Sequence, residues 1–452
     1  MNFVHYTVNQ YLIFSKKFVC KFQASLYLIN KKSVRNLIVF ILILVTFSCK
    51  KEEKIPADTR LRGPGLISLI DDKKVTLTYF SQFLPDKQFN TDILLPYKLV
   101  DPDYFDIYES EGQLKSFKEV IELKNDNIYE YAINNLNNGT PYYFYVVGKK
   151  EGYKPLYSDT IMIIPNQKLT FNTLVTINNN HSISSVSYSP VANKVAYMDK
   201  SYAWNGGANC CMAESIILSS NDNKDSELLA TFSYDPNWSS NGDTIVFAAE
   251  TQGHGYYSQI ALYDLTSKTI TKLTNDTTYY YNPSFSPSDG KLLYQSNKNR
   301  PDINSSNIWL MDLRTFNTEL IIDLSKTNFV DISRPVWMDE NDFIFQGTNS
   351  NTRTSIYKSS ILTKKIEPLI TSGWNDYNAA ISPNADQIAF ISDRSGSEQL
   401  WLFNLQTKEY KQLTGYDEND YFDGNCTKID WIDNNQLLFT FGDNRLTKLL
   451  LR

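Results

Sequence analysis

The chain has 452 residues, of which 42% are hydrophobic and 14% aromatic, enough apolar surface for two or three folded domains, which excludes a disordered protein. Its formal net charge is −6, but residues 1–48 carry six Lys or Arg and no Asp or Glu, so the rest of the chain has 38 basic and 50 acidic residues. This acidic balance, without a basic stripe, disfavours a nucleic-acid partner. Short runs rich in Tyr, Phe, Val, Ile and Thr, separated by Asn, Asp, Gly and Ser, predict an all-β fold.

The first 48 residues have the pattern of an export signal. A cluster of Lys and Arg precedes an unbroken apolar run from Leu37 to Val45. This run is shorter than the roughly 20 residues that a transmembrane helix needs, so we expect residues 1–48 to be a cleaved signal region. Residues 1–30 lie upstream of a normal basic region, and we interpret them as an artefact of the assigned translation start.

The end of the apolar run predicts a lipid anchor. Ser48 precedes Cys49, and a small residue before a Cys at this point resembles the bacterial lipobox, in which the Cys is diacylated and becomes the mature N-terminus. Two or more acyl chains give stable membrane anchoring. The alternative is a free Cys in an ordinary signal. Lys51-Glu52-Glu53 is similar to the acidic signal that sends some Gram-negative lipoproteins to the outer face of the outer membrane, so we expect an outer-membrane lipoprotein, periplasmic or surface-exposed.

A polar tether, residues 49–61, leads into a first domain at residues 62–165. Alternating apolar and polar residues predict short strands at the spacing of a β-sandwich. The strands that we expect are 75–79, 104–108, 129–133 and 142–147.

Part of this domain resembles the fibronectin type III family. Residues 136–147 contain a Leu, a Gly-Thr turn and a Tyr-x-Phe-x-Val strand. In that family the Tyr pins the corner before a central strand, a role that falls on Tyr142 here. The usual Trp of the second strand is absent, and Tyr79 is the nearest candidate. The resemblance implies a spacer or an adhesion module.

Beyond Pro165 one pattern recurs: an aromatic or aliphatic anchor, Ser-Pro or its equivalent, a Gly/Asn/Asp turn, and an apolar strand. The anchors follow one another at intervals of 50, 47, 52, 44 and 50 residues, a period typical of propeller blades. Each copy adds a third and a fourth strand, such as 260–265 and 270–274. The six anchors are Tyr188, Trp238, Phe285, Trp337, Ile381 and Trp431.

These copies resemble the TolB-type (PD40, WD40-like) propeller repeat, in which an aromatic-Ser-Pro-Asp-Gly turn is followed by a Ser-Asp-Arg-x-Gly turn. Residues 285–290 and 392–396 are close matches. We therefore expect residues 166–452 to form a six-bladed propeller, with the strand near 169–177 completing the last blade. Seven blades would need a copy that we do not detect.

The sequence offers little for catalysis. No Gly-x-Ser-x-Gly motif is present, which disfavours a serine hydrolase. The predicted mature chain has two His, His181 and His254, without metal-ligand spacing, so we expect no zinc site. Propeller polysaccharide lyases use several His around a metal. We therefore expect a non-enzymatic protein without cofactors, and leave open calcium bound by Asp and backbone oxygens.

In a propeller, the loops between second and third strands and the loops between blades share one face. Aromatic residues beside Arg and amides are typical of interfaces. The resemblance to TolB-type propellers implies a protein or peptide ligand on this face; the alternatives are a carbohydrate of surface glycan uptake, a propeller polysaccharide lyase or hydrolase, and a purely structural spacer. The candidate ligand-binding residues are Trp204, His254, Tyr256, Tyr280, Asn282, Arg300, Asp331, Arg334, Arg353, Asp376, Tyr377, Arg394, Tyr421 and Asp423.

Three cysteines remain in the predicted mature domains, Cys210, Cys211 and Cys426. Disulfides persist in an oxidising envelope. Cys210 and Cys211 fall in a loop of the first blade and Cys426 falls in the loop entering the last, so we expect a bridge from Cys426 to one of the other two. A vicinal Cys210–Cys211 disulfide and three unpaired thiols are the alternatives.

Overall fold

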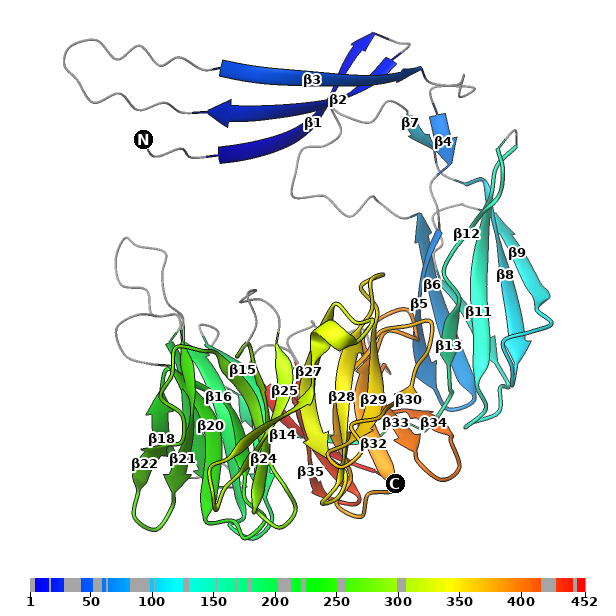
Figure 1. Ribbon diagram of the computed structural model, residues 1–452. Coiled ribbons are helices and arrows are strands. Elements are labelled where there is room, and N and C mark those ends of the chain that lie inside the picture. Colours follow the sequence, from blue (N-terminus) through cyan, green and yellow to red (C-terminus); the bar gives the residue numbers. More distant parts are fainter. Residues whose placement is uncertain are drawn as a thin grey trace. The chain divides into compact units, whose positions relative to one another are not determined.

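A computed structural model of the chain confirms the all-β class (Figure 1). Apart from the 3-10 helix η2 (Leu324–Lys326), every regular element of the described residues is a strand. The structure describes residues 5–15, 18–27, 42–51, 59–61, 64–81, 98–100, 102–124, 130–151, 153–167, 169–176, 181–201, 213–220, 225–250, 257–298, 306–415, 428–441 and 445–451.

The chain divides into two compact units. The first comprises Met1–Arg62 and Phe83–Asp101, and the second comprises Gly63–Gln82 and Pro102–Arg452. In the first unit, β1 (His5–Ser15), β2 (Phe18–Tyr27) and β3 (Leu42–Lys51) form an antiparallel sheet, while β4 (Thr59–Leu61) pairs in parallel with β7 (Lys98–Val100).

Part of the predicted signal region lies in this sheet, because β1, β2 and most of β3 fall within residues 1–48; Cys49 also lies in β3. Among the residues that the structure describes, no helix is long and apolar enough to cross a membrane.

The second unit begins with two sheets that face each other. One has the strand order β10-β6-β5, and the other has the order β12-β11-β8-β9, with β13 also paired to β11. The alternating sequence sends every second side chain into the space between them. The bounds are β5 (Pro64–Asp71), β6 (Lys74–Ser81), β8 (Tyr104–Glu111), β9 (Lys118–Lys124), β10 (Glu130–Asn134), β11 (Tyr142–Lys149), β12 (Leu156–Tyr157) and β13 (Ile161–Ile163).

Two aromatic residues hold this core as the sequence predicts. Tyr79 is 1% exposed and packs against Phe105, with ring centroids 4.9 Å apart. Tyr142 is 2% exposed; its hydroxyl accepts a hydrogen bond from Asn137 N (3.0 Å) and donates one to Glu111 Oε1 (3.2 Å). The corner role predicted for Tyr142 is therefore confirmed.

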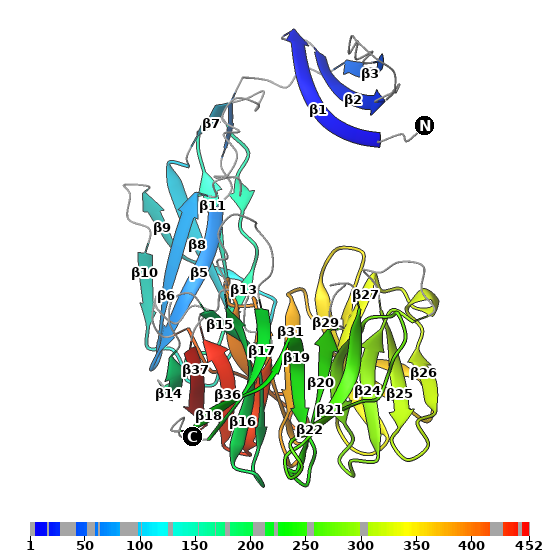
Figure 2. The same ribbon diagram turned by 90° about the vertical axis from the view of Figure 1, so that its left-hand side faces the viewer.

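Six four-stranded antiparallel sheets make up the rest of the described chain (Figures 1 and 2). Each contains one copy of the sequence repeat, and its strands follow one another from the first strand outward. The first three sheets are β15 (His181–Ser189), β16 (Lys194–Ser201), β17 (Ala213–Ser220), β18 (Ser226–Thr231); β19 (Ser233–Trp238), β20 (Thr244–Glu250), β21 (Ser258–Asp264), β22 (Thr269–Lys272); and β23 (Tyr280–Phe285), β24 (Lys291–Ser296), β25 (Asn307–Asp312), β26 (Thr318–Ile322).

The last sheet combines distant parts of the chain. Strand β14 lies beside β37, with Thr170 opposite Leu450, so the predicted completion of this sheet by residues near 169–177 is confirmed. The remaining sheets are β27 (Asp331–Trp337), β28 (Asp342–Thr348), β29 (Thr354–Ser360), β30 (Ile366–Ile370); β31 (Asp376–Ile381), β32 (Gln387–Ser392), β33 (Gln399–Asn404), β34 (Tyr410–Gln412); and β14 (Thr170–Thr176), β37 (Arg445–Leu450), β36 (Gln436–Phe441), β35 (Ile429–Asp433).

The first strands of these sheets contact one another in a closed circuit, β15-β19-β23-β27-β31-β35-β15. Between the sheets, buried side chains form apolar clusters, one at each junction where neighbouring sheets meet. This is the arrangement of a β-propeller.

Three anchor tryptophans connect neighbouring sheets. Trp238 Nε1 donates to Ser187 O (3.1 Å), Trp337 Nε1 donates to Ser284 O (3.0 Å), and Trp431 Nε1 donates to Ala380 O (3.1 Å). In each case the acceptor is a backbone carbonyl in the first strand of the preceding sheet. The anchors thus fill the space between sheets and also satisfy a buried polar group.

The β-sandwich packs directly onto the propeller. Met162 N donates to Arg394 O (2.6 Å) and Ile70 N donates to Gly415 O (2.8 Å). A side chain at Gly396 would clash, because a Cβ there would lie 2.4 Å from Leu66 O. The contact therefore depends on backbone groups at close approach, which only glycine allows at this position.

We predict that the hydrogen bond of Trp337, rather than its ring alone, stabilises the propeller. Trp337→Phe should lower the free energy of unfolding by about 1–3 kcal/mol more than Trp309→Phe, because it leaves Ser284 O without its donor. Trp309 is the matched control: it is 6% exposed against 7% for Trp337, and its Nε1 has no hydrogen-bond partner among the described residues. Chemical denaturation measures both. Equal losses would contradict the role of the hydrogen bond.

Candidate functional site

A cavity of about 90 Å³ lies among the first strands of the propeller sheets. Apart from the anchor Ile381, its lining comes from equivalent places in the second to sixth sequence repeats, within the three residues before the anchor. We call it the central cavity. Its lining residues are Asn237, Asn282, Pro283, Ser284, Arg334, Pro335, Val336, Asn378, Ala379, Ala380, Ile381, Lys428, Ile429 and Asp430.

A β-bulge in four first strands shapes this lining. The pairing register shifts between Tyr281 and Ser284, and the equivalent shift occurs in β19, β27 and β31. A bulged residue leaves the regular ladder, which explains why proline is tolerated directly after it, as in Pro283 and Pro335. Sequence repeats therefore place a side chain at the same bulge in successive sheets.

At each of these four bulges, the residue directly before the proline, or before Ala379 in β31, has a left-handed backbone conformation. The φ angles are +55° for Asp235, +46° for Asn282, +52° for Arg334 and +53° for Asn378. Asp and Asn adopt this conformation more readily than other residues with a Cβ, whereas Arg does so at a cost. Strain of this kind persists where surrounding contacts enforce it, and it concentrates at functional sites.

Side chains of the preceding sheet supply those contacts. Asn282 N donates to Asp235 Oδ2 (3.1 Å), Arg334 N donates to Gln295 Oε1 (2.8 Å), and Asn378 N donates to Gln346 Oε1. Each bulge is thus held by its neighbour, so the cavity wall is preorganised by hydrogen bonds that run from sheet to sheet.

Lys428 and Asp430 bring opposite charges to the cavity. Lys428 Nζ donates to Pro236 O (2.7 Å), while Asp430 accepts from Tyr188 N (2.7 Å) and Trp431 N (2.8 Å). Burial lowers the pKa of Lys428 and raises the pKa of Asp430. Both side chains keep some accessible surface because they face the cavity, yet protein atoms surround them.

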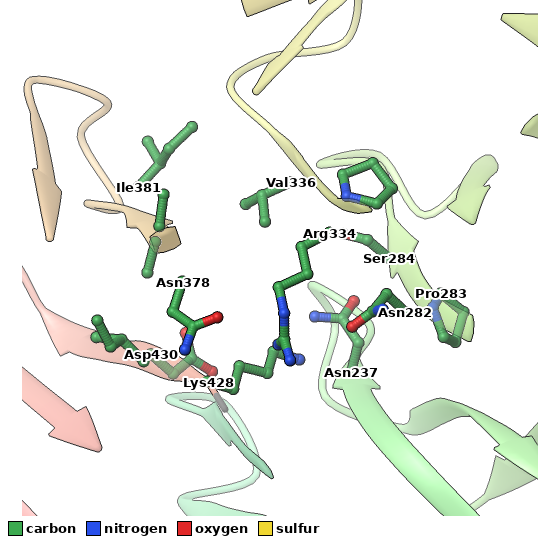
Figure 3. A pocket seen from close by; sticks show the side chains of 14 residues that line it. Asn237, Asn282, Pro283, Ser284, Arg334, Val336, Asn378, Ile381, Lys428 and Asp430 are labelled. Atoms are coloured by element: carbon green, nitrogen blue, oxygen red, sulfur yellow. The ribbon is translucent and has the colours of Figure 1, made fainter. Parts of the chain in front are cut away.

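Figure 3 shows how the cationic side chains lie in the cavity. Arg334 and Lys428 extend toward each other, and the amides of Asn237 and Asn282 lie beside the Arg334 guanidinium. The described lining holds amides, aliphatic groups, two cations and one carboxylate. Such a set can orient a polar group by hydrogen bonds and charge.

Two predicted ligand-binding residues, Asn282 and Arg334, line this cavity. Asp331 lies half-buried at the start of β27, where burial raises its pKa. Tyr377 is partly buried and packs against the apolar cluster around Trp431. Arg353 is exposed and lies elsewhere, at a cleft described below.

Three other predicted residues do not face solvent. Tyr280, Asp376 and Arg394 are 2%, 0% and 1% exposed. Tyr280 donates through its hydroxyl to Asp276 (2.8 Å). Each of these three side chains is enclosed by the fold and presents almost no surface on the loop face, where the sequence predicts ligand binding.

Arg394 and Asp376 form a buried ion pair, with Nη2 and Oδ1 2.5 Å apart. The guanidinium lies over four aromatic rings, among them Tyr410 at 4.3 Å and Trp401 at 5.1 Å from the ring centroids. Cation–π contacts and the carboxylate together compensate for the loss of water. Because Arg394 O also accepts from Met162 N, this pair holds the surface on which the β-sandwich packs.

The other sequence predictions fall outside the described residues. This applies to the ligand-binding candidates Trp204, His254, Tyr256, Arg300, Tyr421 and Asp423, and to the cysteines Cys210, Cys211 and Cys426.

Sequence reasoning missed Asn237, Asn378, Lys428 and Asp430, all of which line the central cavity. The signal was present. Asn378 and Lys428 stand three residues before their anchors, as Asn282 and Arg334 do, and Asn237 and Asp430 stand one residue before theirs. These positions recur at a fixed distance from the anchors, in or directly before the first strands, whereas the predicted binding residues were expected in loops.

A larger cleft, of about 870 Å³, lies where the β-sandwich meets the propeller. Its walls combine apolar groups, such as the exposed Ile67 and Leu114, with polar ones, such as Arg353 and Asp159. Trp374 lines it and donates through Nε1 to Thr160 O (3.1 Å). Its volume lies within the range of small-molecule sites, and such sites often form where domains meet.

The comparisons with known proteins concern the propeller. Residues 145–419 match the family model described as the TolB beta propeller domain. None of the curated protein sequences matches the chain.

Three solved structures illustrate the likeness. A protein assigned as TolB from Agrobacterium tumefaciens is 12% identical, with a TM-score of 0.42, and the match covers 77% of this chain and 99% of that one. TolB from Acinetobacter baumannii is 11% identical, with a TM-score of 0.41 and coverages of 86% and 82%. An oligogalacturonate lyase from Vibrio parahaemolyticus is 10% identical, with a TM-score of 0.41 and coverages of 63% and 97%. These distant likenesses do not separate binding proteins from enzymes.

We predict that Asp376→Asn destabilises the protein by about 3–5 kcal/mol, because it leaves Arg394 buried without a counter-charge. Asp342→Asn is the control: Asp342 pairs with Lys358 at 2.5 Å on a more exposed strand surface, so its loss should cost less than about 1 kcal/mol. Urea denaturation measures both variants. Equal losses of unfolding free energy in the two variants would show that the buried ion pair stabilises the protein no more than the exposed pair does.

Proposed function

Since the chain belongs to the TolB beta propeller domain family, we propose that it is a non-catalytic binding protein of the cell envelope that holds a protein or peptide ligand at its central cavity. The observation that carries this proposal is the preorganised cavity wall, in which successive sheets fix Asn282, Arg334 and Asn378 by hydrogen bonds. A rigid polar pocket is suited to capturing a group that a larger partner inserts.

The size of the cavity favours a protein ligand over a free small molecule. At about 90 Å³ it is well below the roughly 300–1,000 Å³ of typical small-molecule sites. One side chain or one chain end fits a space of this kind, while the rest of the ligand would rest on the surrounding loops. The described lining also has no His and only one carboxylate, Asp430, which supports binding without turnover.

Membrane attachment at Cys49 remains part of the proposal and is supported by the sequence. Processing before Cys49 would remove β1, β2 and most of β3, so the sheet of the first unit would belong to the precursor alone. The mature protein would be held at the bacterial outer membrane through residues 49–61. Its periplasmic or outer location stays open.

We further propose that the sandwich is a fibronectin type III-like spacer and that the propeller has six blades. The strand orders β5-β6-β10 and β12-β11-β8-β9 support the first, because one sheet pairs the first, second and fifth strands of such a domain. The closed circuit of six first strands supports the second. A disulfide bridge from Cys426 to Cys210 or Cys211 remains a prediction. Calcium bound by Asp and backbone oxygens remains the alternative to a protein without cofactors.

Carbohydrate binding is the second candidate. The cleft of about 870 Å³ between sandwich and propeller supports it, since Trp374, Arg353 and Asn375 would offer an aromatic ring and hydrogen-bonding groups to an oligosaccharide. A lyase or hydrolase at this cleft is the least supported alternative. A glycan array and a turnover assay on polysaccharides would decide between these and the peptide proposal.

We predict that filling the central cavity abolishes ligand capture. Ser284→Phe adds a ring to a cavity-lining residue whose side chain makes no hydrogen bond in the described structure, while Ser284 O still accepts from Trp337. Thr271→Phe, on the exposed strand β22, is the control. Pull-down from envelope extracts should recover the same protein with the wild type and the control but not with Ser284→Phe. Equal recovery by all three would contradict binding at the cavity.

Replacing Cys49 with Ser should release the protein into the soluble fraction, because the acylated thiol is the proposed anchor. Fractionation followed by mass spectrometry of the N-terminus measures this. Processed Cys49→Ser protein that still sediments with membranes would refute the lipid anchor.

A further inference from the structure

The cleft of about 870 Å³ between the β-sandwich and the propeller shares no lining residue with the central cavity. Its propeller wall is held together through Asn375. The Asn375 amide accepts from Thr354 N (3.2 Å) and donates to Asp393 Oδ2 (2.8 Å), and Asn375 N donates to Asp393 Oδ1 (2.8 Å). Because these bonds join segments from two neighbouring sheets, this wall of the cleft is preorganised.

Most polar side chains of this wall are engaged within the protein. Ser372 Oγ donates to Asp376 Oδ2 (2.6 Å), and Trp374 Nε1 donates to Thr160 O (3.1 Å). Both carboxylate oxygens of Asp393 accept hydrogen bonds, as described above. A ligand with many hydroxyl groups would give up hydrogen bonds to water there and find few replacements, which costs binding free energy.

Arg353 is the exception on this wall. Its side chain is exposed at the cleft and makes no hydrogen bond or ion pair with the described residues. Its backbone is fixed, because Arg353 N donates to Asn349 Oδ1 (3.1 Å) and Arg353 O accepts from Asn349 N (2.9 Å). A guanidinium has five donors in a planar fork that matches a carboxylate. A rigid turn therefore presents a cation to a ligand in the cleft.

The sandwich wall adds apolar surface. Ile67 and Leu114 line the cleft and are 37% and 54% exposed. Ligand sites are typically concave and mostly apolar, with a few polar groups that fix the orientation of the ligand. The cleft has this composition, with aliphatic side chains on one wall and an arginine on the other.

We propose that this cleft binds a peptide segment in which an acidic residue lies beside aliphatic residues. Arg353 pairs with the acidic side chain, and Ile67 and Leu114 contact the aliphatic ones. The inference goes beyond the proposed function, because it concerns a second site. The volume agrees, since about 870 Å³ falls within the roughly 300–1,000 Å³ of sites that enclose ligands of this size.

Short peptides test the proposal with the full chain. Isothermal titration compares acetyl-Leu-Glu-Leu-amide with its Gln and Lys counterparts and with acetyl-Gly-Glu-Gly-amide. We expect saturable binding of the Leu-Glu-Leu peptide and weaker binding of the other three. The Lys peptide tests whether Asp159, the exposed acid on the sandwich wall, attracts a cation instead. High salt should weaken binding of the Glu peptide, because the interaction is between charges.

Variants locate the effect. Arg353→Gln should weaken binding of the Glu peptide by about 10-fold, as expected for loss of a hydrogen bond between charged groups. Arg314→Gln is the control, since Arg314 is also exposed but does not line the cleft. Leu114→Asp should weaken binding as well, whereas Leu362→Asp, at another exposed leucine, should not. Ser284→Phe fills the central cavity and should bind the peptide as the wild type does. Thermal unfolding verifies that each variant is folded.

Cellotetraose and maltotetraose are the carbohydrate probes. Binding of either sugar without binding of the Glu peptide would overturn the peptide site and favour the carbohydrate candidate. Equal or tighter binding of the Gln or Lys peptide, or full binding by folded Arg353→Gln, would also overturn it. Loss of peptide binding in Ser284→Phe would place the peptide in the central cavity, which rejects this inference and leaves the proposed function standing.

Discussion

The propeller depends on hydrogen bonds that pass from each sheet to the next through its first strand. Bulges in β19, β23, β27 and β31 release backbone groups from their own ladders. Buried polar groups without partners are costly, so each must be satisfied by another part of the fold. The neighbouring sheet supplies the partner, as Gln295 does for Arg334 N and as Trp337 does for Ser284 O. The same hydrogen bonds between neighbouring sheets therefore close the circuit of first strands and shape the central cavity.

Two arginines show how the same side chain can serve opposite purposes. Arg394 is enclosed by aromatic rings and matched by Asp376, so its charge is satisfied within the wall and it contributes to the contact with the β-sandwich. Arg334 lines the central cavity together with Lys428 and Asp430, and its backbone N–H donates to Gln295 Oε1 of the preceding sheet. The difference is the place in the fold: Arg394 lies in a turn at the contact with the sandwich, whereas Arg334 lies at a bulge that faces the cavity.

Sequence periodicity was enough to predict the sheets, because each repeat carries its own anchor and turn. Completion of the last sheet by β14 also followed from the pattern, since Trp431 begins a repeat that lacks one strand. The role of Tyr142 was predictable for the same reason, as its corner is local in sequence. These features depend on residues that are close in sequence or that recur at a fixed interval along the chain.

The roles of Asp376 and Arg394 could not be predicted in this way. Asp376 begins β31 and Arg394 lies in the turn after β32, and their ion pair is enclosed by aromatic rings and by the contact of Arg394 O with Met162 N. Ile70 N and Met162 N, which make the contact, lie far away in sequence and belong to no repeat.

The contact between sandwich and propeller uses the same kind of interaction as the contacts between propeller sheets. Because Gly396 admits Leu66 O at its backbone and Trp374 donates to Thr160 O, the two meet through close backbone approach and hydrogen bonds to carbonyl oxygens. The anchor tryptophans do the same between sheets, as Trp337 does with Ser284 O. Buried carbonyl groups need donors wherever they meet another part of the chain, so a tryptophan N–H serves at both kinds of junction.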